Sequence, residues 1–156
     1  MYKRQAGKLL EKYGEANTRL WIVPPTRMDE HQLKQEGYYK IFENSKARVE
    51  IPGCSLCMGN QARAADGTTM VSTSTRNFPN RMGDGCNVYL ASSEVTAISS
   101  LLGKIPNLEE YQDYMKDLNT MSSEVFRYMN FNEIEDYLRK VRDMDISHLD
   151  IEEIKD

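Results

Sequence analysis

Hydrophobic positions along this chain follow two patterns, compact runs and a helical repeat. Compact apolar or β-branched runs, bounded by turn residues, are typical of short buried strands. Between and after them, apolar residues recur at the spacing of amphipathic helices. The predicted strands are residues 19–23, 48–51, 67–73 and 87–91, and the predicted helices are residues 6–13, 28–35, 38–42 and 92–102.

Residues that favour helix ends support these assignments. Thr26 precedes the second predicted helix, and Ser92 or Ser93 precedes the fourth, as N-caps do. Gly103 follows the fourth helix, where glycine is favoured. After Pro106 the pattern is helical only, as far as residue 141. Strands alternating with helices, and then helices alone, predict an α/β fold with a C-terminal helical extension.

Composition narrows the classes of protein. The 156 residues suffice for one domain with a core, and 40% of them are hydrophobic. The net charge of -4 gives no general reason to expect nucleic-acid binding. No apolar run approaches the roughly 20 residues of a membrane span, and the basic N-terminus lacks the apolar region of a secretory signal. Three cysteines favour a reducing compartment over a disulfide framework, so we expect a cytoplasmic location.

The cysteine loop, residues 52–59, reads Pro-Gly-Cys-Ser-Leu-Cys-Met-Gly. Its Cys54 and Cys57 could bind a metal, form a thiol redox couple, or be two buried thiols. Zinc needs four ligands, and a cubane cluster usually needs four thiolates, so the pair alone is an incomplete site. Cys86 could be a third ligand, but it lies in a separate turn.

The arginine loop, residues 76–85, begins Arg-Asn-Phe-Pro-Asn-Arg. Pro79 stiffens the segment between Arg76 and Arg81. Two guanidinium groups in one stiff loop suit a di- or tricarboxylate, although two solvated arginines are the simpler interpretation. Both loops follow predicted strands. Since ligands bind at the carboxyl ends of strands in open α/β sheets, we expect the two loops to face one site.

These two motifs resemble the aconitase superfamily. The superfamily's cluster loop is similar to residues 52–59, and its Arg-Asn-Phe-x-x-Arg loop is similar to residues 76–81. The longer sequences around both motifs, together with Gly37-Tyr38-Tyr39 and residues 87–92, resemble the bacterial B-type aconitate hydratases.

The resemblance implies both fold and chemistry. The fold would be part of a three-layer α/β domain with helices on both faces of the sheet. Cys54 and Cys57 would be two of the three cysteine ligands of a [4Fe-4S] cluster, and Arg76 and Arg81 would bind substrate carboxylates. The substrates would be citrate, isocitrate and cis-aconitate, in the tricarboxylic acid cycle.

The departures from the family pattern are equally informative. No cysteine precedes Cys54, Cys86 lies outside the family's ligand pattern, and the Ser-Ser-Arg motif with the catalytic base is missing. We therefore expect the C-terminal part of a longer lyase, inactive by itself, with no catalytic residue and with the parent's other domains as partners. Met1 to Gln5 would be an artefact of truncation. The expected regions are a cluster-binding part (6–104), a helical extension (105–142) and a disordered acidic tail (143–156).

Other functions stay open. Within the superfamily these are 2-methylisocitrate dehydratase and isopropylmalate isomerase, which share both loops. Outside it, the cluster-free protein could bind mRNA, or the cysteine pair could serve a small thiol-redox or metal-binding module.

Overall fold

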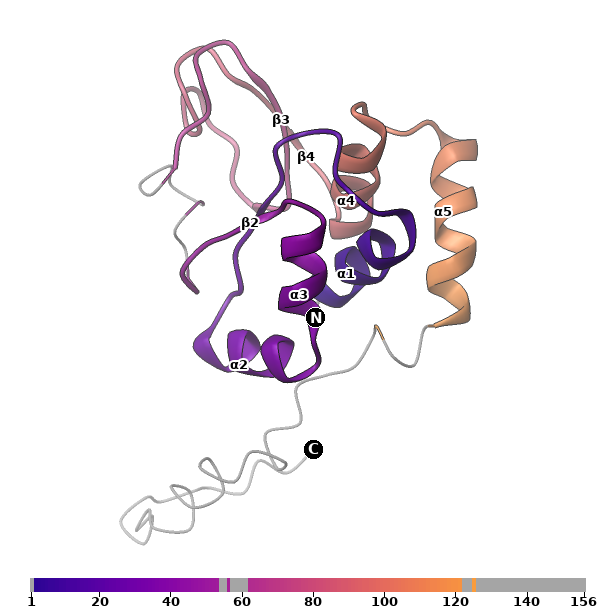
Figure 1. The fold of residues 1–156 in the computed structure, drawn as a ribbon. Coiled ribbons are helices and arrows are strands. Elements are labelled where there is room, and N and C mark those ends of the chain that lie inside the picture. The colour runs from indigo at the N-terminus through magenta and orange to yellow at the C-terminus, as the bar shows by residue number, and fades with distance from the viewer. Residues whose placement is uncertain (1, 54–55, 57–61, 122–124, 126–156) are drawn as a thin grey trace, which may run out of the picture.

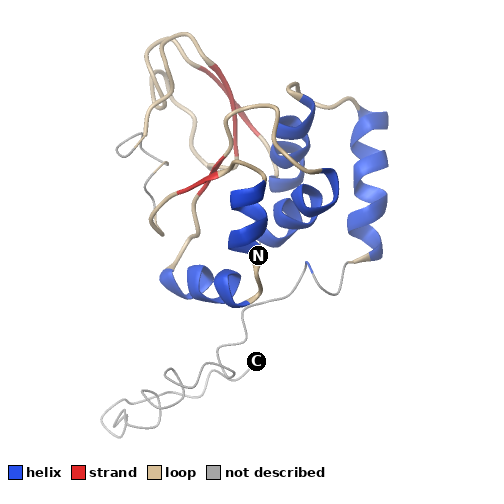
Figure 2. Cartoon of the chain, in the orientation of Figure 1, coloured by secondary structure: helices blue, strands red, loops and turns tan. Residues whose placement is uncertain are grey.

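The computed structural model describes residues 2–53, 56, 62–121 and 125. Figures 1 and 2 show short strands at the centre of this part, with helices α1, α4 and α5 on one side. The helices are α1 (Tyr2–Tyr13), α2 (Arg27–Gln35), α3 (Tyr38–Asn44), α4 (Ser93–Leu102) and α5 (Leu108–Thr120). The strands are β1 (Trp21–Ile22), β2 (Arg48–Val49), β3 (Thr69–Ser72) and β4 (Asn87–Leu90).

The predicted helix caps are confirmed. The Thr26 side chain accepts a hydrogen bond from the Asp29 amide, and the Ser92 side chain accepts one from Val95. Gly103 ends α4 in the left-handed conformation, with φ 76°. The contacts of Thr26 and Ser92 satisfy amide groups that the first turn of a helix leaves without partners, so local sequence was enough to find them.

Helix α1 begins at Tyr2, four residues before the predicted start. Arg4 and Gln5 are buried, with exposed fractions of 3% and 2%. Arg4 donates two hydrogen bonds to the Glu36 carboxylate, at 2.6 and 2.7 Å, and Ser93 donates one to Gln5. Residues 4 and 5 therefore pack as part of the described helices, and the expectation that residues 1–5 are an artefact of truncation stays a prediction.

The strands form two parallel pairs. Strand β1 pairs with β2, and β3 pairs with β4, with Trp21 opposite Arg48 and Thr69 opposite Asn87. Five helices with short parallel strands confirm the α/β class for the described part of the chain. A three-layer arrangement with helices on both faces of one sheet stays a prediction.

The core lies where α1 crosses α4 and α3. Its fully buried members include Leu9, Leu10, Phe42 and Ile98. Gly7 lets α1 approach α3, since a Cβ built there would lie 2.3 Å from the Tyr38 ring. Close helix contacts of this kind depend on the lack of a side chain.

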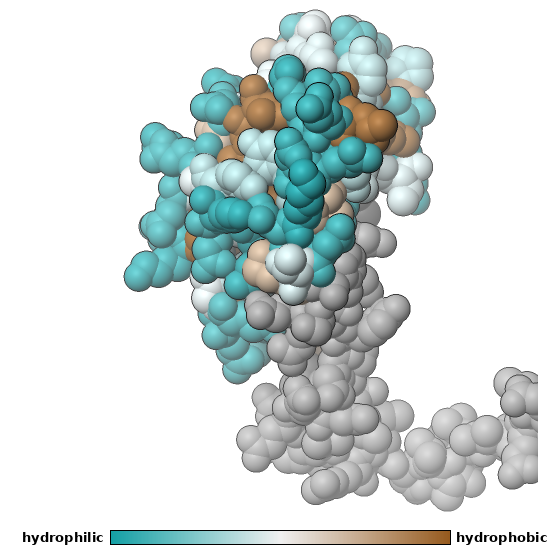
Figure 3. All heavy atoms as spheres, turned by 90° about the vertical axis from the view of Figure 1, so that its right-hand side faces the viewer, coloured by the Kyte–Doolittle hydropathy of each residue, from teal (hydrophilic) through white to brown (hydrophobic). Residues whose placement is uncertain are grey.

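Helix α5 covers the first part of the predicted extension and packs on α1. The rings of Tyr13 and Tyr114 lie 4.4 Å apart, and Lys12 pairs with Asp117 at 2.5 Å. Figure 3 shows a mostly hydrophilic surface on this side of the molecule. The rest of the helical pattern expected to residue 141, apart from Met121 and Val125, lies outside the described residues, and so does the acidic tail. None of the described helices is long and apolar enough to cross a membrane.

Candidate functional site

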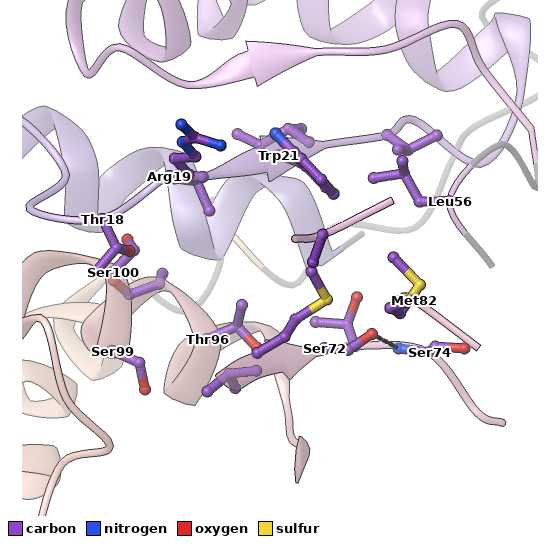
Figure 4. A pocket seen from close by; sticks show the side chains of 18 of the residues that line it. Thr18, Arg19, Trp21, Leu56, Ser72, Ser74, Met82, Thr96, Ser99 and Ser100 are labelled. Atoms are coloured by element: carbon purple, nitrogen blue, oxygen red, sulfur yellow. Dashed lines mark hydrogen bonds between the residues drawn. The ribbon is translucent and has the colours of Figure 1, made fainter. Parts of the chain in front are cut away.

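A cavity of about 960 Å³ lies between strands β1 and β3. Helices α1 and α4 contribute to its wall, and segments next to both predicted motifs reach it (Figure 4). Residues on its wall include Trp21, Gly53, Leu56, Ser72, Ser74, Arg81, Met82 and Thr96.

Arg81 is the predicted substrate-binding residue that reaches this cavity. It is 2% exposed, and its Nη2 donates to the Ser72 Oγ at 3.4 Å. In such surroundings a guanidinium interacts more strongly with a carboxylate than it would in water. Its position on the cavity wall therefore suits the binding of an anion.

Arg76 has a different environment. It is exposed and is not among the residues that line the cavity. Its amide donates to the Ser74 Oγ at 3.3 Å, and the neighbouring Asn77 side chain donates to the Val88 carbonyl at 2.9 Å. The start of the arginine loop is thus tied to β4 by Asn77, but the two arginines do not meet in this cavity.

Cys54 and Cys57 lie outside the described residues. Gly53 and Leu56, which adjoin them in sequence, both line the cavity. The Gly53 amide donates to the Pro24 carbonyl at 3.0 Å, which ties this point of the cysteine loop to the segment that follows β1. The two predicted motifs therefore approach one cavity, as far as the described residues define it.

The segment after the cysteine loop is joined to the arginine loop. The Ala64 amide donates to the Met82 carbonyl at 2.6 Å, and Arg63 pairs with Asp84 at 3.2 Å. Gly83 is packed so closely that a Cβ there would lie 2.6 Å from the Ala64 oxygen. These contacts hold Arg81 in place relative to residues 63–65.

The Cys86 thiol donates to the Ala65 carbonyl at 3.3 Å. It therefore joins the residue after the arginine loop to the segment after the cysteine loop. Within the described part of the chain, no group of three or more Cys, His, Asp or Glu side chains could hold a metal ion. The candidate metal ligands stay the two thiols at positions 54 and 57.

Sequence reasoning missed other parts of the cavity wall. Trp21 was assigned to a buried strand, yet its side chain points toward the cavity (Figure 4). Met82 and Thr96 also lie there, from the arginine loop and from α4. Their only sequence signal was adjacency to a motif or a helix face, which does not distinguish a cavity wall from a core.

Comparisons with known proteins agree with both motifs. Residues 3–103 match the sequence model of the aconitase family (aconitate hydratase). Aconitate hydratase B of Escherichia coli strain K12 is 59% identical over 138 residues, which cover 88% of this chain and 16% of that protein. Aconitate hydratase B of Helicobacter pylori strain J99 is 50% identical over 135 residues, which cover 86% of this chain and 16% of that protein.

A more distant relative is the large subunit of 3-isopropylmalate dehydratase from Bacteroides fragilis. It is 38% identical over 91 residues, which cover 58% of this chain and 20% of that subunit. The chain spans 16% of the length of the aconitate hydratases that it matches. Because the family match extends over residues 3–103, including both loops, this chain belongs to the aconitase family.

Proposed function

We propose that this chain provides the cluster-binding and carboxylate-binding part of an aconitate hydratase, which interconverts citrate and isocitrate through cis-aconitate. The observation that carries the proposal is the position of Arg81. It is buried on the wall of a cavity that Gly53 and Leu56, next to the cysteine pair, also line. An anion held by Arg81 would therefore lie near the cysteine loop.

The chain's own residues would bind and orient the substrate. Arg81 presents a guanidinium to one carboxylate, and Arg76 would bind another. The hydroxyl groups of Ser72 and Ser74, both on the cavity wall, can donate further hydrogen bonds. Trp21 and Met82 add apolar surface, which excludes water and strengthens those polar contacts.

The residues present fit part of a [4Fe-4S] site. Two thiolates are suitable ligands for iron–sulfur clusters, and Cys54 and Cys57 would hold the cluster. Gly53 has φ 126°, and no atom of the described residues lies within 4 Å of a Cβ placed there, so the described backbone before Cys54 leaves room for a bulky group. When bound, the cluster supplies a Lewis acid for the substrate's hydroxyl and carboxylate. A third ligand and the catalytic base would come from outside this chain.

A chimaeric enzyme tests the proposal. In Escherichia coli aconitate hydratase B, the 138 matched residues would be replaced by those of this chain. We expect the chimaera to convert citrate and isocitrate, followed by the ultraviolet absorbance of cis-aconitate. Cys54→Ser should abolish turnover and lower the iron content. The control Cys86→Ser should keep iron content and turnover, because Cys86 contacts a backbone carbonyl and lies outside the family's ligand pattern.

Substrate preference is read from the same assay. The similarity to a 3-isopropylmalate dehydratase subunit makes isopropylmalate the second candidate, and 2-methylisocitrate is the third. A chimaera that contains iron but turns over only one of these two would overturn the assignment to aconitate hydratase. Equal loss of iron in Cys54→Ser and Cys86→Ser would overturn the ligand assignment.

A further inference from the structure

Asn80 has an uncommon backbone conformation directly before the buried Arg81. Its φ is 61°, in the left-handed region. Among the described residues other than glycine, only Lys46 also has a positive φ. Residues with a side chain avoid this region because the Cβ crowds the following carbonyl oxygen, although asparagine tolerates it better than most. Such a conformation persists only where the surrounding structure fixes it.

The conformation of Lys46 has a simple explanation. Helix α3 ends just before it, and the Lys46 amide donates to the Glu43 carbonyl at 3.0 Å. A left-handed residue at this place is a common way to end a helix. Asn80 follows no helix, since residues 76–85 lie in the loop between β3 and β4. The reason for its conformation must therefore lie in the loop.

Asn80 is the third residue of a tight turn. The Arg81 amide donates to the Phe78 carbonyl at 3.3 Å, so Pro79 and Asn80 are the two central residues. Proline followed by a residue with a positive φ is the pattern of a type II turn. The Asn80 side chain adds a second closure, because its Oδ1 accepts a hydrogen bond from the Gly85 amide at 2.8 Å. The two contacts fix the loop on both sides of Arg81.

This turn directs the chain from the surface into the interior. Residues 76–80 are exposed, whereas residues 81–83 are buried. A residue at position 80 with the usual helical φ would differ by roughly 120° in this torsion and would send the chain in another direction. Arg81 depends on the present direction, because its Nη2 donates to the Ser72 Oγ at 3.4 Å and the residue lines the cavity.

Asn80 does not itself reach the cavity. It is exposed and is not among the residues that line the cavity, whereas Arg81 and Met82 are. The Ala64 amide donates to the Met82 carbonyl at 2.6 Å, so the chain after Arg81 is held as well. An effect of Asn80 on an anion in the cavity must therefore pass through Arg81.

We propose that Asn80 is a positioning residue that turns Arg81 into the cavity for carboxylate binding. Two properties of asparagine are used, its tolerance of a positive φ and the side-chain oxygen that accepts from Gly85. An arginine that is already oriented loses less conformational entropy when a carboxylate binds, so the turn increases affinity. The effect on Arg81 follows from the loop geometry, while the effect on turnover rests on the proposed function.

Three substitutions in the chimaeric enzyme separate the two properties. Alanine lacks both, glycine keeps only the tolerance of a positive φ, and aspartate keeps both. We expect kcat/KM for citrate to fall by about 30-fold in Asn80→Ala, by about fivefold in Asn80→Gly and by less than about threefold in Asn80→Asp. The control Lys46→Ala places alanine at the other left-handed position, which does not line the cavity, and should keep kcat/KM.

A double-mutant cycle identifies the residue through which Asn80 acts. In the Arg81→Lys background, Asn80→Ala should lower kcat/KM by less than about threefold, because the group to be positioned is already lost. A purely structural effect of Asn80→Ala would be equally large in both backgrounds.

A second measurement does not need turnover. Phenylglyoxal modifies accessible guanidinium groups, and mass spectrometry of the digested chimaera follows each arginine separately. Arg81 should react at least about tenfold faster in Asn80→Ala than in Asn80→Asp, because the strained turn rearranges and exposes its side chain. Arg76, which is exposed in the same loop, should react equally in both variants and is the internal reference.

The outcomes separate this inference from the proposed function. An unmutated chimaera without turnover, together with the expected reactivity of Arg81, would contradict the proposed function and support the role of Asn80. Equal reactivity of Arg81 in Asn80→Ala and Asn80→Asp would overturn the inference. So would equal kcat/KM in these two variants, or an undiminished effect of Asn80→Ala in the Arg81→Lys background. If Asn80→Ala does not fold, the same comparisons apply to Asn80→Gly, with the smaller expected differences.

Discussion

Arg76 and Arg81 are five positions apart and carry the same side chain, yet their surroundings differ. Arg81 is 2% exposed on the cavity wall, whereas Arg76 is exposed on the loop. The sequence motif predicts the same role, carboxylate binding, for both residues. Because Arg81 is buried, its guanidinium group is held in one orientation by its neighbours, and we expect carboxylate binding to depend more on Arg81 than on Arg76.

Replacing Arg81 with lysine tests this difference. In the chimaeric enzyme we expect Arg81→Lys to lower kcat/KM by about 100-fold, since an ammonium group cannot reproduce a bidentate contact with a carboxylate. Arg63→Lys, at an exposed ion pair with Asp84, is the control and should keep kcat/KM. Similar losses in both variants would show that loop packing, and not carboxylate binding, is affected.

Gly7 provides a prediction about stability. Alanine is normally favoured over glycine within a helix. Here a Cβ would lie 2.3 Å from Tyr38 Cδ1, so we expect Gly7→Ala to lower the free energy of unfolding by about 1–3 kcal/mol. The measurement is urea denaturation followed by circular dichroism. The exposed Glu11→Ala on the same helix should change stability little, and a stabilised Gly7→Ala would contradict the close packing of α1 on α3.

At the scale of elements, Arg4 joins the start of α1 to the end of α2. Its guanidinium and the Glu36 carboxylate form a two-bond pair, and this carboxylate raises the pKa of Arg4. Arg4→Ala should cost about 2–4 kcal/mol of unfolding free energy, because it removes both hydrogen bonds of this buried guanidinium to a partly buried carboxylate. Lys8→Ala removes the more exposed pair with Glu11 on the same helix and should cost less than about 1 kcal/mol. Equal effects would contradict the anchoring role of Arg4.

The contact between α1 and α5 should respond to acid. Hydrogen bonds from Lys12 and Tyr13 lower the pKa of Asp117 from its ordinary value of 3.8. A carboxylate with a lowered pKa stabilises the fold above that ordinary value, and the contribution is lost as the pH falls through the lowered pKa. We therefore expect the protection factors of α5 amides, which correct for intrinsic exchange at each pH, to fall below pH 3.8, and Asp117→Asn to show the lower protection already at neutral pH. An unchanged α5 in the variant would contradict this contact.

For the whole molecule, the proposed site is incomplete within these 156 residues. The sequence holds two cysteines of the cluster motif and no Ser-Ser-Arg motif. After anaerobic reconstitution with iron and sulfide, the chain alone should retain little iron and should not turn over citrate. Iron content and cis-aconitate absorbance measure the two outcomes. Full hydratase turnover by the chain alone would overturn the prediction.

Much of the fold was predictable because its signals are local. Thr26, Ser92 and Gly103 form caps with residues a few positions away, so their identity and spacing were sufficient. The strand runs were also recognisable, although β1 and β2 are only two residues each. The motifs at residues 52–59 and 76–81 indicated the family for the same reason, since each lies within one short segment.

By itself, the sequence determined the N-caps of α2 and α4, the C-terminal glycine of α4, the existence of four strands, the α/β class and the two motifs. Only the tertiary structure decided that α1 begins at Tyr2, that Arg81 and not Arg76 reaches the cavity, and that β1 and β3 face each other across it. These features depend on contacts between distant residues, such as Arg4 with Glu36 and Ser93 with Gln5. Spacing along the chain carries no signal for such pairs, because packing brings them together only after the elements have formed.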